Sequence, residues 1–185
     1  MSLMHTPVCD FGLLAPDFDL LGVDDKQWTR DQCMGENGLL VMFICNHCPY
    51  VKSIQQRLVK DVSVLQQHGI GVVAIMSNNP HDYPDDSFEN MQRVAEEKNY
   101  NFPYLIDATQ RVAKEYGAVC TPDFFGYNRQ LQLQYRGRLD ASGMDTDMNN
   151  AKRDLVEAMV LVAKTGEGPT EQIPSMGCSI KWIEP

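Results

Sequence analysis

Two cysteines separated by two residues are the part of this chain best suited to chemistry. The stretch FICNHCPYVK places Asn46 and His47 between Cys45 and Cys48, with Pro49 directly after them. Two cysteines at this spacing can come close enough for a reversible disulfide when they lie at a helix start. His47 would favour a thiolate as a cation and could relay a proton as a neutral imidazole. The spacing therefore predicts a redox-active dithiol.

The residues around this pair predict its place in the fold. The run GLLVMFI at 38–44 is continuously apolar, which is typical of a strand buried on both faces. Apolar residues from Val51 to Leu65 recur every three or four positions, which predicts a helix that Cys48 opens and whose first turn contains Pro49. The unpaired N–H groups and the dipole of such a helix start lower a cysteine pKa from about 8.5. We therefore expect a reactive thiolate at neutral pH.

Two other interpretations of these residues stay open. Both cysteines could be small buried side chains without chemistry. Cys45, His47 and Cys48 could also join Cys120 or Cys178 in a copper(I) or zinc site, giving a binding module without catalysis. The chain has no second Cys-x-x-Cys motif or His pair to complete a structural zinc site. We expect neither a metal nor a cofactor.

The rest of the chain alternates between strand and helix patterns. The further elements predicted are a hairpin over 13–30, strands over 70–76 and 102–107, helices over about 88–99 and 108–117, a hairpin of strands over 123–128 and 131–137, and a helix over 149–166 capped by Asn149 or Asn150. Strand–helix–strand alternation requires parallel strands with right-handed crossovers, and the closing hairpin adds antiparallel ones. The pattern predicts a three-layer α/β/α sandwich around a mixed sheet.

Length and charge limit the classes of protein to consider. We expect a single domain over residues 1–185, with an N-terminal tail at 1–12, a core at 13–166 and an irregular C-terminal tail at 167–185. The formal net charge of −9 argues against nucleic-acid partners. The absence of a long apolar run argues against a membrane partner. The start MSLMHTPVCD lacks the pattern of a signal peptide, so we expect a cytoplasmic protein whose six cysteines are not structural disulfides.

A second motif makes a resemblance to a known family visible. FICNHCPYVK is followed about seventy residues later by VCTPDFF at 119–125, and APDFDLLGVDDKQWT precedes it as a hairpin. Together these stretches resemble the thioredoxin fold, in its peroxiredoxin-like branch with the alkyl hydroperoxide reductase and thiol-specific antioxidant proteins. The resemblance implies that the Thr121–Pro122 peptide bond is cis and faces the dithiol. It also implies that the Thr121 backbone is free to pair with an extended peptide or partner disulfide.

The resemblance implies two enzymatic activities. In a thiol–disulfide oxidoreductase, the leading hypothesis, Cys45 would attack because its place at the strand end is the more exposed, and Cys48 would resolve the mixed disulfide. In a thiol peroxidase, Cys48 would react with peroxide and Cys45 would stand where peroxiredoxins carry a threonine. Peroxiredoxins also use an arginine near the position of Thr121, and this chain has none there. The partners expected are a disulfide-containing protein or a small thiol or peroxide, and a dithiol reductant.

Two further cysteines are candidates for a third thiol. Cys120 directly precedes Thr121, so it should lie near the dithiol either as a redox thiol or as a small buried side chain. Cys178 is on the C-terminal tail, and tail cysteines of peroxiredoxin relatives can resolve a sulfenic acid. Whether this tail reaches the dithiol is not decided by the sequence.

Overall fold

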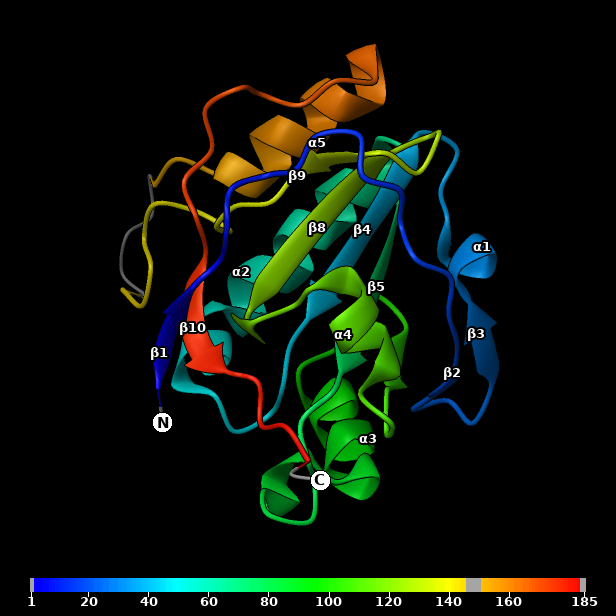
Figure 1. Cartoon of the computed structure of the whole chain (residues 1–185), viewed down its shortest axis with the longest axis vertical. Helices are drawn as coiled ribbons and strands as arrows, with labels where there is room; N and C mark the ends of the chain where they lie inside the picture. The colour runs from blue at the N-terminus through cyan, green and yellow to red at the C-terminus, as the bar shows by residue number, and fades with distance from the viewer. Residues whose placement is uncertain (1, 146–150, 184–185) are drawn as a thin grey trace.

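A seven-stranded mixed sheet forms the centre of the protein in the computed structural model, which describes residues 2–145 and 151–183 (Figure 1). Its strands are β2 (Asp19–Gly22), β3 (Gln27–Thr29), β4 (Gly38–Phe43), β5 (Ile70–Met76), β6 (Tyr104–Ile106), β8 (Asp123–Asn128) and β9 (Leu133–Tyr135). The spatial order is β3-β2-β6-β5-β4-β8-β9. The pairs β4–β5 and β5–β6 are parallel, whereas β8 is antiparallel to β4.

Helices cover both faces of this sheet. They are α1 (Arg30–Cys33), α2 (Pro49–Gln67), α3 (Phe88–Glu97), α4 (Arg111–Tyr116) and α5 (Asp154–Thr165), with a short 3-10 helix at Pro84–Asp86. Buried residues of α2, α3 and α5 belong to one hydrophobic cluster, and those of α1 and α4 belong to another. The three-layer α/β/α fold predicted from the sequence, including the N-terminal hairpin, is confirmed.

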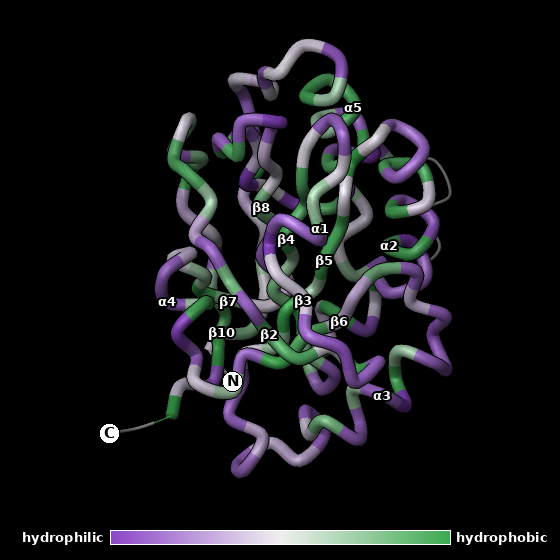
Figure 2. The backbone as a smooth tube through the Cα atoms, turned by 90° about the vertical axis from the view of Figure 1, so that its right-hand side faces the viewer, coloured by the Kyte–Doolittle hydropathy of each residue, from purple (hydrophilic) through white to green (hydrophobic). Residues whose placement is uncertain are grey.

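The central strand β4 shows why its sequence has no polar alternation. Successive side chains of a strand point to opposite faces. Leu40 and Met42 belong to the cluster under α2, and Leu39 and Val41 belong to the cluster under α4. All six residues of β4 are buried, and the neighbouring β5 is likewise hydrophobic along the backbone tube in Figure 2. Both faces of β4 therefore require apolar side chains, which produces the uninterrupted run.

A second, three-stranded sheet joins the two ends of the chain. It consists of β1 (Leu3–His5), β10 (Met176–Ser179) and β7 (Cys120–Thr121), in the order β1-β10-β7. Figure 1 shows β1 and β10 side by side at the edge of the molecule. The sequence analysis did not anticipate a strand in either terminal segment. Strands of three and four residues that pair only with distant segments leave no periodic signal in the sequence.

The last helix begins later than its pattern suggested. α5 starts at Asp154 with Arg153 as its N-terminal cap, rather than at 149. The two asparagines predicted as caps, Asn149 and Asn150, lie outside the described residues. Among the residues that the structure describes, no helix is long and apolar enough to cross a membrane.

Helix α2 has Cys48 as its N-terminal cap, so the packing of this helix against the sheet stabilises the position of that cysteine. Leu58 on its inner face is fully buried in the cluster between α2 and the sheet. We expect Leu58→Ala to lower the free energy of unfolding by about 2–5 kcal/mol, because it removes buried methyl groups and leaves a cavity. Urea denaturation followed by circular dichroism measures this change. Lys60→Ala, at an exposed position of the same helix, should change it by less than about 0.5 kcal/mol.

Candidate redox site

The two cysteines lie where the central strand ends and the longest helix begins. Cys45 comes two residues after the end of β4, and Cys48 is the N-terminal cap of α2, with Pro49 in its first turn. This is the edge at which open α/β sheets place their reactive groups. The sequence analysis placed both residues correctly with respect to the strand and the helix.

Thr121 contacts both sulfur atoms. Its hydroxyl Oγ1 lies 3.2 Å from Cys45 Sγ, and its carbonyl oxygen lies 3.2 Å from Cys48 Sγ. The peptide bond between Thr121 and Pro122 is cis. Thr121, the last residue of β7, therefore contacts both of the sulfurs that β4 and α2 bring together.

Both sulfurs are shielded from solvent. Cys45 is 1% exposed and Cys48 is 0% exposed. The difference in exposure that was expected to favour Cys45 is therefore negligible, because both cysteines are buried. The strand end does not face solvent, because the side chain of Cys45 turns inward to contact Thr121.

The two thiols share their protons unequally. The pKa of Cys48 is lowered to about 4, first by the hydrogen bond that it receives from Cys45; burial opposes this, and the side chain and backbone N–H of Cys178 lower it further. The backbone amide of Val51, in the first turn of α2, contributes less. Burial raises the pKa of Cys45, and its hydrogen bond to Cys48 raises it again. Ionisation of the pair is therefore favoured at Cys48 over Cys45.

A buried carboxylate holds the two residues between the cysteines. Asp86, in the 3-10 helix after β5, accepts hydrogen bonds from the backbone N–H groups of Asn46 (2.7 Å) and His47 (3.2 Å). Its other oxygen accepts from His47 Nδ1 (2.6 Å) and from Asn78 Nδ2 (2.9 Å). Burial alone raises the pKa of Asp86, but the hydrogen bonds from His47 and Asn78 outweigh it, so that the pKa is lowered. The carboxylate stays ionised and fixes the loop.

Asp86 also fixes the tautomer of His47. Because an ionised carboxylate only accepts hydrogen bonds, Nδ1 carries a proton. His47 Nε2 is buried and forms no hydrogen bond within the part of the chain that is described, and the ring stacks on Tyr83 at 4.8 Å between centroids. The imidazole therefore has one ring nitrogen, Nε2, that is available to accept a proton within the loop between the two cysteines.

The sequence analysis missed Asp86, although a signal was present. Parallel strands end at the same sheet edge, so the loop after β5 had to lie beside the loop after β4. That loop, SNNPHDYPDD, contains three aspartates, and nothing in the sequence distinguishes the buried Asp86 from the exposed Asp82 and Asp85. Asn46 adds a second tie in the same place, because its side-chain oxygen accepts a hydrogen bond from the Tyr104 hydroxyl (3.0 Å).

A metal ion has one candidate position among the described residues. Ligand atoms of Cys45, His47 and Asp86 lie within 4.8 Å of one another. Both oxygens of Asp86 already accept hydrogen bonds, one from backbone N–H groups and the other from the ring of His47. A cation here would have to replace these bonds, so the residues fit a hydrogen-bonded network better than a metal site.

The structure brings one of the two additional cysteines into contact with the dithiol. Cys178 pairs with Thr121 through β10 and hydrogen-bonds to the Cys48 sulfur. Cys120 is also buried, but its sulfur bonds only weakly to the Pro122 carbonyl (3.6 Å), and burial raises its pKa strongly. The resemblance implied that the Thr121 backbone is free to pair with an external peptide. This expectation is wrong, because Thr121 pairs with Cys178 of the same chain.

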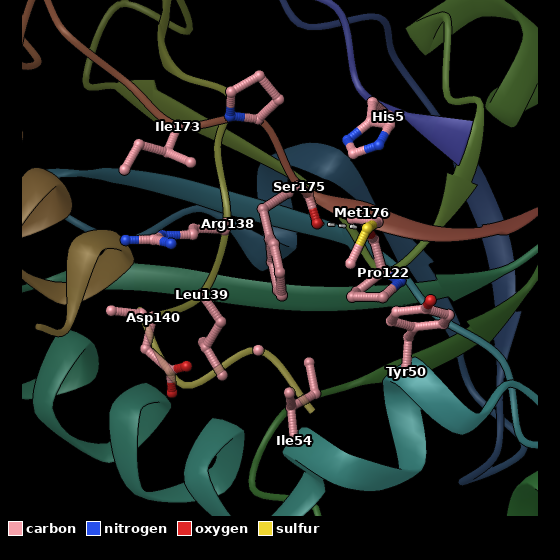
Figure 3. A pocket seen from close by; sticks show the side chains of 14 residues that line it. His5, Tyr50, Ile54, Pro122, Arg138, Leu139, Asp140, Ile173, Ser175 and Met176 are labelled. Carbon is pink, nitrogen blue, oxygen red and sulfur yellow. Dashed lines mark hydrogen bonds between the residues drawn. The ribbon is translucent and has the colours of Figure 1, made fainter. Parts of the chain in front are cut away.

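A cavity of about 300 Å³ lies on the other side of Pro122 (Figure 3). Tyr50 and Ile54 from the first turns of α2 line it, together with Leu139 and Met176. Ser175 and Pro122 also line it, and the hydroxyl of Ser175 donates a hydrogen bond to the Pro122 carbonyl (2.9 Å). The cavity walls are mostly apolar, and none of the site's sulfur atoms lines it.

The source of the low Cys48 pKa can be tested with two substitutions at position 45. Cys45→Ala removes the hydrogen-bond donor and should raise the Cys48 pKa, whereas Cys45→Ser keeps a donor and should raise it less. Thiolate absorbance at 240 nm, titrated with circular dichroism as a check on folding, measures both. The wild-type inflection near 4 should disappear in Cys48→Ser. An unchanged inflection in Cys45→Ala would show that the neighbouring thiol is not the main donor.

The role of Asp86 predicts a pH-dependent loss of stability. Because its pKa is lowered in the folded state, the ionised carboxylate stabilises the fold above the unfolded value of about 4, and this contribution disappears as the pH falls through the folded value. Asp86→Asn should therefore lower the free energy of unfolding by about 1.5–3 kcal/mol at pH 7 and by less below about pH 4. Denaturant titrations at both pH values measure it. Asp82→Asn, exposed in the same loop, should have little effect at either pH.

Comparison with known proteins agrees with this fold. An uncharacterized conserved protein from Geobacillus kaustophilus is 41% identical, with 99% of this chain and 97% of that chain covered and a TM-score of 0.92. A hypothetical protein from Sinorhizobium meliloti is 37% identical, with 97% of each chain covered and a TM-score of 0.90. The thioredoxin domain of a thiol-disulfide oxidoreductase from Bacteroides vulgatus shares the fold at 16% identity, with 68% and 86% covered and a TM-score of 0.58.

A search of curated proteins gives no significant match. The model of the AhpC/TSA family, in contrast, matches residues 11–140, which include β2 to β9 of the central sheet, the dithiol and Thr121–Pro122. This confirms the resemblance seen in the sequence: the chain belongs to the AhpC/TSA family.

Proposed function

We propose that this protein is a thiol–disulfide oxidoreductase that cycles Cys45 and Cys48 between a dithiol and a disulfide. The observation that supports this most is the pairing of a buried thiolate with a thiol donor, aligned on opposite polar atoms of Thr121. Thiolate is the nucleophile of disulfide exchange, and its partner must be close enough to displace the product. Cys45 and Cys48 meet both requirements.

The direction of the pKa shifts exchanges the roles first assigned to the two cysteines. Cys48, the sulfur with the lowered pKa, attacks one sulfur of a substrate disulfide and releases the other as a thiolate. Cys45 then loses its proton and attacks Cys48, which forms the internal disulfide and releases the second substrate thiolate. The two leaving thiolates take up the Cys45 proton and one from solvent. A dithiol reductant, acting in a reducing compartment such as the cytoplasm, restores the starting state.

The loop between the cysteines supports the proton transfers. His47 and Asp86 have ligand atoms within 4.8 Å of Cys45 Sγ. Because Asp86 keeps the Nδ1 proton in place, the ring can accept a proton at Nε2 and release it again. We assign His47 and Asp86 a positioning and proton-carrying role and Asn46 a positioning role.

A thiol peroxidase is the second candidate. Cys48 followed by Pro49 at the start of α2 stands where this family carries its peroxide-reactive cysteine, and Cys45 donates to it in place of a hydroxyl. The groups that lower the Cys48 pKa most are thiols and backbone amides, and none of them is an arginine. A bound peroxide would therefore lack a cation to polarise it, in agreement with the absence of an arginine near Thr121 in the sequence.

The reduction of two disulfides by dithiothreitol tests the proposal: insulin, and the small 2-hydroxyethyl disulfide. We expect the wild type to accelerate at least the small substrate and Cys48→Ser to return the rate to the uncatalysed value. Cys45→Ser should stop at a mixed disulfide on Cys48, visible by mass spectrometry. Cys33→Ser, buried in the cluster on the opposite face of the sheet, is the matched control and should keep the wild-type rate.

Two results would count against this activity. If the wild type accelerates neither reduction and forms no Cys45–Cys48 disulfide across a glutathione redox series, the dithiol has no exchange function. If instead hydrogen peroxide is consumed faster than either disulfide, with dimedone trapping a sulfenic acid on Cys48, the peroxidase is the correct activity.

A further inference from the structure

The C-terminal strand occupies the backbone edge that an extended peptide would use at this site. In the antiparallel ladder between β10 and β7, Cys178 stands opposite Thr121 and Ser179 opposite Cys120. The other edge of β10 pairs with β1, where Leu3 stands opposite Cys178. The chain thus supplies its own peptide to the residue that contacts both sulfurs of the dithiol.

Gly177 lets this strand approach closely. A Cβ atom at this position would lie 2.0 Å from the carbonyl oxygen of Thr121 and 3.1 Å from the nitrogen of Pro122. Both are backbone atoms that have no rotamer to change, so any other residue would push β10 away. The absence of a side chain at Gly177 is therefore what brings the neighbouring Cys178 to the dithiol.

The sulfur of Cys178 lies against that of Cys48. Its thiol and its backbone N–H both hydrogen-bond to Cys48 Sγ, and the residue is 3% exposed. Burial and the adjacent Cys48 raise the pKa of Cys178 to about 11. In the reduced protein, hydrogen bonds from two thiols, Cys45 and Cys178, therefore favour ionisation of Cys48.

Polar contacts hold the tail in this register on both sides of β10. Before the strand, the Ser175 carbonyl accepts from the backbone N–H of Thr6, and the Ser175 N–H donates to the Thr6 hydroxyl. The Ser175 hydroxyl donates to the Pro122 carbonyl. After it, the backbone N–H of Lys181 donates to Asn78 Oδ1 (2.8 Å), and its carbonyl accepts from the backbone of Asn79 (2.9 Å). Since Asn78 also bonds to Asp86, the tail is part of the same network as the dithiol loop.

We propose that Cys178 is a third redox thiol, which exchanges with the Cys45–Cys48 disulfide to form a Cys48–Cys178 disulfide. The inference rests on the dithiol function proposed above. The Cys178 thiolate attacks Cys48 Sγ, the S–S bond to Cys45 breaks, and Cys45 leaves as a thiolate that takes up the proton lost by Cys178. One disulfide replaces another, so no external oxidant or reductant enters the step. Attack falls on Cys48 rather than Cys45 because Cys48 is the sulfur that Cys178 contacts.

The test equilibrates the full-length chain in glutathione redox buffers, blocks thiols with acid and alkylating agent, and maps disulfides by mass spectrometry. The wild type should contain both the Cys45–Cys48 and the Cys48–Cys178 bonds. Cys45→Ser should contain only the Cys48–Cys178 bond, and Cys178→Ser only the Cys45–Cys48 bond. In Cys45→Ser/Cys178→Ser, Cys48 lacks both of the thiols that hydrogen-bond to it and should be recovered as its glutathione adduct instead.

Substitutions in β10 test whether the position of Cys178, and not only the presence of its thiol, is needed for the Cys48–Cys178 bond. Gly177→Val should abolish the Cys48–Cys178 bond and keep the Cys45–Cys48 bond, with circular dichroism showing that the variant folds. Met176→Val, whose side chain is more than one-third exposed on the same strand, should keep both bonds. Cys120→Ser should keep both as well, since Cys120 does not contact Cys48.

The outcomes separate this inference from the function on which it rests. A Cys45–Cys48 disulfide in the wild type, without any Cys48–Cys178 bond in the wild type or in Cys45→Ser, overturns the inference and leaves the oxidoreductase intact. A Cys48–Cys178 bond without any Cys45–Cys48 bond overturns the exchange and the proposed dithiol cycle together. Equal yields of the Cys48–Cys178 bond in Gly177→Val and the wild type would overturn the role of the strand.

Discussion

A sulfur anion that is removed from water must find its stabilisation within the protein, and this requirement governs the whole site. Cys48 is fully buried, so burial by itself would keep its thiol protonated. Hydrogen bonds from Cys45 and Cys178 reverse that effect, and the carbonyl of Thr121 accepts from the sulfur while it still carries a proton. Ionisation of Cys48 therefore depends on contacts among four segments: the end of β4, the start of α2, β7 and β10. The helix start, to which the sequence analysis gave the main part, contributes less than the two neighbouring thiols.

The mixed sheet is what makes these segments meet. Parallel β4 and β5 end at one edge, which places the dithiol loop beside the loop that carries Asp86. Antiparallel β8 starts at that same edge, with Asp123 opposite Phe43, so the preceding Thr121 arrives next to both sulfurs. A sheet of parallel strands alone would have started β8 at the opposite edge. The antiparallel return of the closing hairpin is thus as important for the chemistry as the position of Cys48 on α2.

The sequence predicted the parts of this arrangement that local patterns encode. The buried run at 38–44 and the helical spacing after Pro49 place the dithiol, because period and strand length respond to burial over many residues. Asp86 and β10 were not predicted, because long-range contacts decide their roles. Asp86 is the one of three aspartates in its loop that turns inward. The four residues of β10, MGCS, pair with a segment more than fifty positions away. The burial of Cys45 was not predicted for the same reason, since its side chain contacts the distant Thr121.

The position of β10 also links the ionisation of Cys48 to the strand that pairs with the backbone edge of β7. The thiol and backbone N–H of Cys178 help to keep Cys48 ionised, and both reach the sulfur only while β10 is paired with β7. An external peptide that displaced the strand would remove these donors and meet a sulfur with a higher pKa, unless it supplied donors of its own. In the oxidoreductase proposed above, a small disulfide, or Cys178 itself, would meet Cys48 with both donors in place. Because the same strand both stabilises the Cys48 thiolate and covers the peptide edge, we expect it to favour small substrates and internal exchange over extended protein partners.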